Sequence, residues 1–254
     1  MGRIPLIRAS QADPFVGGLR EAGWRATPLL ESVGIAPDVV EADPEALVPE
    51  YAIWDLVDRC AEKAGSEHFA WETGLGSPIA DLGVFGRRVG SAPSLGEALD
   101  LFLRAVAEHS SHARFSVIRR RDALWFCRHG IRGIDVGAWQ VELYVLGIMV
   151  HVTRLALGAD WVPQALLLKQ RPPRGAALPA ELRDARVTHG ATVTAIQLPT
   201  SALDEPLVAG PPPVSKEAPI ELEVTASVRI VLQHTLPTGL AALDHTARLA
   251  GVTG

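Results

Sequence analysis

The feature that most constrains the fold is a change in the spacing of apolar residues near His112. Before this point apolar residues recur every three or four positions, which is typical of amphipathic helices. After it, residues 115–117 and 124–127 follow an apolar pattern typical of strands, and a charged corner separates them. The sequence therefore predicts a β-hairpin that follows a helical region.

Helices are expected on both sides of this hairpin. Ser94 and Glu97 form a capping box just before Leu95, which predicts the start of one helix, and a long helix is expected over 137–158. Shorter helices are expected at 15–22, 28–33, 50–64, 69–75 and 82–89, and further strands at 164–169 and 192–198. We predict an α+β fold, in which a helical N-terminal part packs with a small, mainly antiparallel sheet and a long central helix.

A run of three prolines within residues 209–214 indicates a stiff, extended linker. Beyond it, apolar residues resume at helical spacing and form a stripe of Ile220, Val224, Val228 and Val231. The stripe can pack on its own domain or form a dimer seam of coiled-coil type, and its length does not decide between them. The predicted units are a first domain (1–209), a linker (210–219), a linker or dimerisation helix (220–236) and the start of another domain (237–254).

Composition narrows the classes of protein to which the chain can belong. The chain is 48% hydrophobic and 21% charged, which is ordinary for a globular protein, and its two cysteines are too few for a secreted disulfide framework. No apolar run has the length and freedom from charge of a membrane helix, so we expect a cytoplasmic protein without a membrane partner. The formal charge of −5 has the wrong sign for a surface that binds phosphates.

The last fifteen residues have the spacing of the first half of a helix-turn-helix. Leu243 precedes Ala247 by one turn, and Gly251 follows four residues later, where such a motif needs a small residue and then a sharp turn. The chain ends at Gly254, before any recognition helix. A chance match of small residues near the end of the chain is the alternative. If the motif is genuine, a DNA-binding domain is truncated here, and DNA contact comes only through its missing C-terminal part.

Three blocks of sequence occur in a characteristic order. They are Asp81-Leu82-Gly83 with Gly86, then Ser91 to Leu99, then Leu198-Pro199 through Pro206-Leu207. Together with the segment 14–35 and the helix-turn-helix start, they resemble the arabinose-binding-like N-terminal domain of AraC-family transcription regulators. The resemblance implies a sensor domain that binds a small effector, forms a homodimer and controls attached helix-turn-helix motifs.

Glu142 is the first candidate for effector binding, because it lies at the edge of the apolar side of the long helix. A carboxylate there is costly unless it is paired. An arginine or a backbone donor can pair with it, its side chain can reach solvent, or it can anchor a cationic effector such as an amine. We expect the effector between this helix and the sheet, with walls drawn from Tyr144, Trp71, Phe85, Trp125 and Trp139.

Other classes of function have weaker support in the sequence. The motifs of serine hydrolases, phosphate loops, zinc proteases, redox cysteine pairs and dinucleotide binding are absent, so we expect no catalytic residues and no enzyme. His109 and His112 lack a third ligand at a supporting spacing, so no metal and no cofactor are expected. A ligand-free dimerisation module with a filled interior is the main alternative. An enzyme that uses Glu142 with His109 or His151 is a weaker one.

Overall fold

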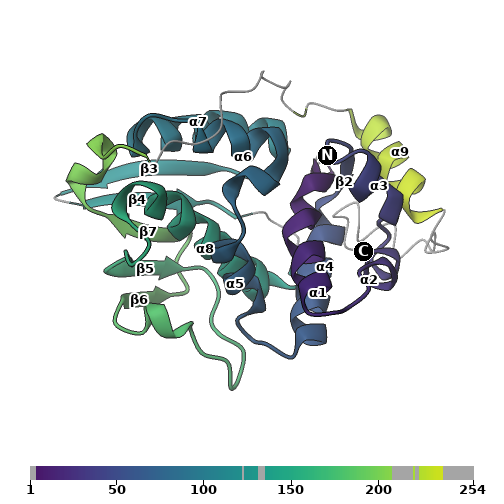
Figure 1. Ribbon diagram of the computed structural model, residues 1–254, viewed down its shortest axis with the longest axis horizontal. Coiled ribbons are helices and arrows are strands. Elements are labelled where there is room, and N and C mark those ends of the chain that lie inside the picture. Colours follow the sequence, from purple (N-terminus) through teal and green to yellow (C-terminus); the bar gives the residue numbers. More distant parts are fainter. Residues whose placement is uncertain (1–3, 122, 131–134, 208–219, 221–222, 237–254) are drawn as a thin grey trace.

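The computed structural model describes residues 4–121, 123–130, 135–207, 220 and 223–236. Figure 1 shows the sheet on one side of the molecule and the short N-terminal helices on the other, with helices α5 and α8 between them. This arrangement confirms the predicted α+β fold.

The main sheet contains the predicted hairpin. Its strands, in spatial order, are β3 (Phe115–Arg120), β4 (Ala123–Arg128), β7 (Thr194–Leu198), β5 (Ala165–Leu168) and β6 (Arg186–His189). All neighbours pair antiparallel except β5 and β6, and Phe115 lies opposite Arg128 in the hairpin. The sheet is thus mainly antiparallel, as predicted. The edge strand β6 was not predicted, because its alternating residues are exposed or only half-buried and give no apolar pattern.

The predicted helices α5 (Phe69–Gly76) and α8 (Ala138–Leu157) form the centre of the molecule, and the predicted helix α7 (Leu95–His109) packs against β3. The Ser94 hydroxyl accepts a hydrogen bond from the Glu97 backbone N–H at 3.3 Å, as its capping role requires. Helices α5 and α8 cross closely at Gly74 and Gly147. A Cβ on Gly147 would lie 2.8 Å from the Trp71 carbonyl oxygen, so the crossing requires glycine there.

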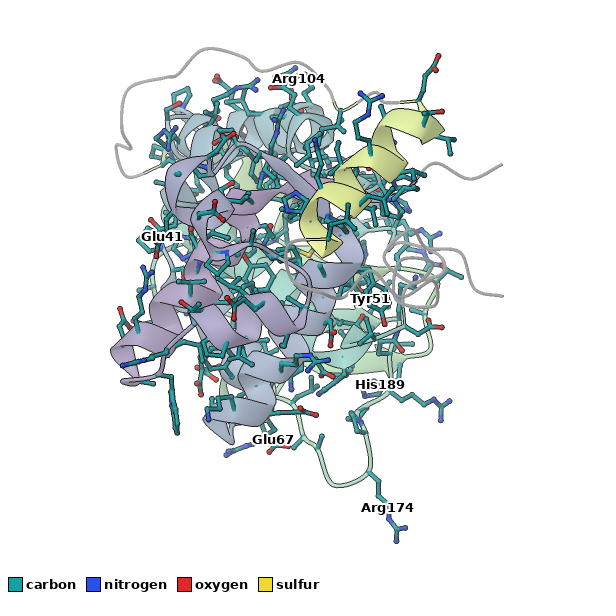
Figure 2. All side chains as sticks on the ribbon, turned by 90° about the vertical axis from the view of Figure 1, so that its right-hand side faces the viewer. Glu41, Tyr51, Glu67, Arg104, Arg174 and His189 are labelled. Atoms are coloured by element: carbon teal, nitrogen blue, oxygen red, sulfur yellow. The ribbon has the colours of Figure 1, made fainter. Side chains whose placement is uncertain are left out.

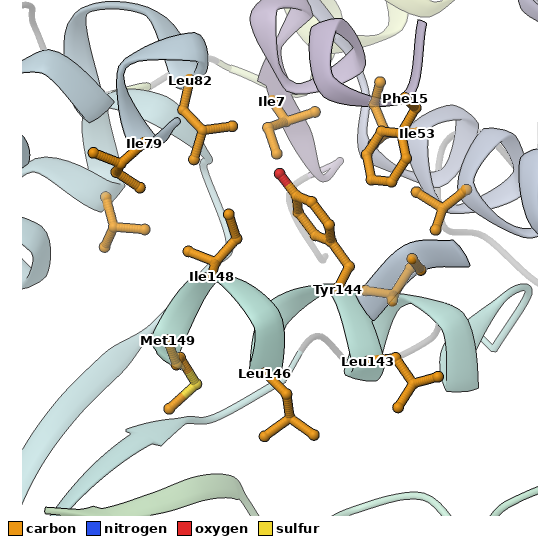
Figure 3. Close-up of a cluster of buried hydrophobic side chains, with 14 of the residues drawn as sticks. Ile7, Phe15, Ile53, Ile79, Leu82, Leu143, Tyr144, Leu146, Ile148 and Met149 are labelled. Atoms are coloured by element: carbon orange, nitrogen blue, oxygen red, sulfur yellow. The ribbon is translucent and has the colours of Figure 1, made fainter. Parts of the chain in front are cut away.

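Helix α8 is buried on two opposite sides. Figure 3 shows Tyr144 and Ile148 pointing towards Ile7 and Leu82, whereas Leu143, Leu146 and Met149 leave the helix on its other side. By length and composition α8 is apolar enough to cross a membrane, but 67% of its apolar window is buried inside the molecule. It is therefore a core helix between two layers.

The N-terminal region contains four predicted helices: α1 (Asp13–Glu21), α2 (Thr27–Ser32), α4 (Glu50–Ala64) and α6 (Gly83–Gly90). Before and between them lie further short elements: β1 (Leu6–Arg8), η1 (Ala9–Ala12), α3 (Pro37–Ala42), β2 (Leu47–Pro49) and η2 (Ile79–Leu82). Two more short helical turns, η3 (Ala180–Leu182) and η4 (Thr200–Asp204), come later in the chain. Strands β1 and β2 pair antiparallel and form a separate ribbon. Each has three residues, too few to produce a detectable period, and neither was predicted.

Helix α9 (Val224–Thr235) lies on the surface beside β2 and α3 (Figures 1 and 2). The His234 Nε2 atom is 2.9 Å from the Leu47 carbonyl oxygen of β2. Of the predicted stripe, Ile220 and Val231 are buried in this domain, Val224 is half-buried, and Val228 is 37% exposed. Packing on the domain thus accounts for part of the stripe. The predicted linker 210–219 and the helix-turn-helix residues Leu243, Ala247 and Gly251 lie outside the described residues.

Candidate functional site

A central cavity of about 80 Å³ lies beside α8. It is bounded mainly by α4, α7 and α8, and it reaches the main sheet at Phe115 and Arg128. We expected a site between α8 and the sheet, whereas helices supply most of this wall. The apolar side chains of the lining are Ile7, Ile53, Val57, Leu82, Phe85, Phe102, Val106, Ala113, Phe115, Val141, Val145 and Ile148.

One polar group of the lining joins three elements through hydrogen bonds. The Gln11 side-chain amide donates to the Tyr144 hydroxyl at 2.8 Å, so its carbonyl oxygen faces His109 and accepts from Nε2 at 3.0 Å. Burial, with a contribution from Arg8, lowers the pKa of His109 to about 3. The imidazole is therefore neutral near pH 7, and its proton lies on Nε2.

A second polar group surrounds Glu50, the first residue of α4. Its Oε2 accepts a hydrogen bond from the Ser110 hydroxyl at 3.0 Å. Burial raises the pKa of the Glu50 carboxyl to about 7, although the positive charge of Arg128 and the Ser110 hydrogen bond act against this shift. Arg128, at the end of β4, is buried and lines the same cavity. The cavity thus combines apolar walls with a few buried hydrogen-bonding groups, as small-molecule sites do.

The structure brings two of the predicted site residues, Tyr144 and Phe85, into the lining of this cavity. Glu142 lies outside it. The backbone N–H groups of Lys169 and Gln170 each donate to a Glu142 oxygen at 2.7 Å, and the Thr194 hydroxyl donates as well. Backbone donors, one of the alternatives for Glu142 left open by the sequence, therefore pair with its carboxylate.

A smaller pocket of about 60 Å³ adjoins the central cavity. Glu142 lines this pocket, and Trp54 and Arg128 line both spaces. The three predicted tryptophans line neither of the two: Trp71 is fully buried in α5, Trp139 is buried near the start of α8, and Trp125 is half-buried in β4.

The sequence interpretation missed Gln11, Glu50, Trp54 and Arg128. A signal for Arg128 was present, because it lies two residues after Phe126 in a strand and therefore points to the same buried side. Gln11 and Glu50 gave no local signal, since their partners lie 60 or more residues away in the chain.

Residues 23–207 match the family model described as the arabinose-binding domain of AraC transcription regulators, N-terminal. The chain belongs to this family. The resemblance inferred from the sequence blocks is therefore confirmed. The AraC-type domain is a ligand-binding domain of transcription regulators, which is not an enzyme class.

Among solved structures, the crystal structure of the transcriptional regulator CdpR from Pseudomonas aeruginosa is similar to this AraC-type chain. The two are 16% identical, the match covers 96% of this chain and 76% of that chain, and the TM-score is 0.52. At this identity the likeness shows a shared fold. No curated protein sequence matches the chain.

Two lining residues of the cavity, Ile7 and Gln11, precede the region that matches the family model. They come from β1 and η1, so the wall of the site includes the N-terminal segment. Among the described residues, no three His, Cys, Asp or Glu side chains gather where they could hold a metal ion.

Proposed function

We propose that this domain is the cytoplasmic sensor of an AraC-type regulator, and that a small effector binds in the central cavity and controls an attached DNA-binding domain. The observation that carries the proposal is the combination of an apolar cavity with a few buried hydrogen-bonding groups in its lining, in a domain of this family. The domain releases its ligand unchanged, because its role is binding rather than catalysis.

The β1–β2 ribbon supports a route from the cavity to α9. Ile7 of β1 lines the cavity and pairs with Val48 of β2, and Glu50 follows β2 directly. On the other side of the same ribbon, Leu47 accepts the hydrogen bond from His234 of α9. An effector that contacts Ile7 or Glu50 therefore acts on residues that pair with or directly follow β2, the strand that α9 also contacts.

The control we propose is a population shift between two arrangements of α9. An effector shifts such an equilibrium only through its different affinities for the two arrangements. The protein acts as a homodimer, and the side of α9 around Val228 and Val224 is the proposed seam, since Ile220 and Val231 are already buried in the domain. Effector binding then changes the orientation of the DNA-binding domains that follow α9.

The effector must be small, or the cavity must widen to admit it. A cavity of about 80 Å³ is roughly half of the ~150 Å³ cavity known to hold benzene. An amine held by Glu142 is one proposed class of effector. Because three donors already bind this carboxylate, an amine would have to share it or displace a donor.

A thermal-shift panel of amines, amino acids, sugars, carboxylates and fatty acids tests the sensor function. A compound at about 100 times its Kd adds about 2.7 kcal/mol, which raises the Tm by several degrees. The blocking variant is Val145→Phe, which fills the cavity from α8, and the matched control is Val162→Phe at an exposed position. Stabilisation of the wild type and Val162→Phe, but not of Val145→Phe, is the expected result.

Two outcomes would count against this function. If no compound stabilises the wild type, a ligand-free dimerisation module explains the domain better. If Val145→Phe responds as strongly as the wild type, the ligand binds elsewhere. The route to α9 is tested separately by hydrogen exchange, in which effector binding is expected to change the protection of amides in both β2 and α9.

A further inference from the structure

Arg128 is a buried cation that has no hydrogen-bonded anion among the described residues. Its side chain points inward at the end of β4, and the residue is 7% exposed. Within the described part of the chain, no group accepts a hydrogen bond from its guanidinium, and no carboxylate oxygen lies within 4.0 Å. Its guanidinium carbon lies 5.2 Å from the centroid of the Trp54 ring, and the charges of Glu50 and Glu142 act on it without a hydrogen bond. Burying an ion is costly unless hydrogen bonds and an opposite charge compensate, so this arrangement indicates that a partner is missing.

Arg128 also lies where two empty spaces meet. It lines both the apolar central cavity and the smaller pocket, and Trp54 is the other residue that they share. A molecule whose polar end contacts Arg128 can therefore extend its apolar part between Phe102, Val106 and Val145. The guanidinium carries five N–H donors in a planar fork that fits the two oxygens of a carboxylate.

The two carboxyl groups whose charges act on Arg128, Glu142 and Glu50, do not occupy its hydrogen-bond donors. Both oxygens of Glu142 already accept hydrogen bonds from the backbone of Lys169 and Gln170. Glu50 accepts from Ser110 through one oxygen, and its raised pKa of about 7 keeps much of it protonated near neutral pH. A protonated Glu50 donates a hydrogen bond to a ligand carboxylate instead of repelling it.

We propose that Arg128 binds the carboxylate of the effector, and that the ligand is a small apolar carboxylic acid whose hydrocarbon part fills the central cavity. This inference rests on the proposed function, since it names the ligand class for the same site. The small size of the two spaces favours a short branched chain or a single ring.

The test measures binding of matched probes by calorimetry. One set is benzoate, benzamide and benzylamine, a second is isovalerate, isovaleramide and isoamylamine, and a third is the straight-chain acids from acetate to octanoate. Within each matched set the shape is nearly constant and the polar group changes from anion to neutral amide to cation. We expect a carboxylate to bind the wild type at least tenfold more tightly than its amide, and the amine not to bind.

Three variants assign this preference to Arg128. Arg128→Lys keeps the charge but loses the planar fork, and at least a tenfold loss in carboxylate affinity is expected. Arg128→Met removes the charge, and a loss of at least a hundredfold is expected, so that the carboxylate no longer binds better than the amide. Arg114→Gln removes an exposed arginine outside the cavity and is expected to bind as the wild type does. Circular dichroism checks the fold of each variant, and Arg128→Lys provides the test if Arg128→Met does not fold.

The outcomes separate this inference from the proposed function. If an amide or amine binds as tightly as its carboxylate, and Val145→Phe abolishes that binding, the sensor function stands and the carboxylate assignment is wrong. If a carboxylate binds but Arg128→Lys and Arg128→Met retain its affinity, the assignment to Arg128 is overturned. If no probe of any class binds the wild type, the carboxylate inference fails and the sensor function loses its support from this cavity.

Discussion

Replacing Glu50 with glutamine is expected to remove a pH-dependent loss of stability. Burial raises the pKa of the Glu50 carboxyl from 4.5 to about 7 in the folded protein. The folded state therefore holds the proton more tightly than the unfolded chain. The stability from this group is complete below about pH 4.5 and is lost as the pH rises through 7. Since one pKa unit corresponds to about 1.4 kcal/mol, the loss amounts to about 3 kcal/mol at pH 8.

Glutamine resembles the protonated carboxyl in size and charge. Glu50→Gln and the wild type should therefore be nearly equal in stability at about pH 4.5, and the variant should be more stable by up to about 3 kcal/mol at about pH 8. His109 has a lowered pKa, so its contribution is lost as the pH falls from 6.5 towards 3, but it is present in both proteins and cancels in the difference.

Urea unfolding at about pH 4.5, 6 and 8 measures this difference. Glu31→Gln is the matched control, because Glu31 is exposed, and it should follow the wild type at every pH. A stability difference between Glu50→Gln and the wild type that is the same at all three values would refute the reasoning. Such a result would mean that Glu50 does not titrate in this range and that the substitution acts through packing or the Ser110 hydrogen bond alone.

Three further predictions test the fold. Gly147→Ala should lower the free energy of unfolding by about 1–3 kcal/mol, because the new Cβ would meet the backbone of α5. Gly17→Ala in α1 has open space around it and should raise the free energy of unfolding by about 0.5–1 kcal/mol. Equal effects of the two substitutions in thermal unfolding would contradict the close crossing of α5 and α8. Ser94→Ala should cost about 1 kcal/mol through loss of the α7 cap, and an unchanged Tm would show that this hydrogen bond contributes nothing. Cys60 should resist iodoacetamide until the protein unfolds, since burial raises the pKa of its thiol to about 12, and rapid labelling of the native protein, read by mass spectrometry, would disprove its burial.

The elements that the sequence predicted have signals contained within a short segment. The capping box at Ser94 marks the start of α7, and the period of two marks the β3–β4 hairpin. The long apolar run predicted α8, whose observed bounds lie one residue inside those expected at each end. These signals arise from caps, turns and side-chain spacing, which depend on neighbouring residues.

The cavity required the tertiary structure. Gln11 and Tyr144 lie 133 positions apart, and Gln11 and His109 lie 98 apart, so nothing in either segment indicates that they meet. Helix α8 misled the search for the pocket, because it is buried on two opposite sides and a helical wheel cannot tell which side faces a cavity.

Glu142 and Arg128 show the same difference between what the sequence and what the tertiary structure can determine. The sequence by itself placed Glu142 at the edge of the apolar side of its helix, and the strand period contained a signal for a buried Arg128 that the interpretation missed. Only the tertiary structure decided which of them already has partners. The backbone of Lys169 and Gln170 reaches Glu142, whereas Arg128 meets two empty spaces. The free energy of a buried charge depends on the groups that surround it in space, and sequence spacing does not contain those groups.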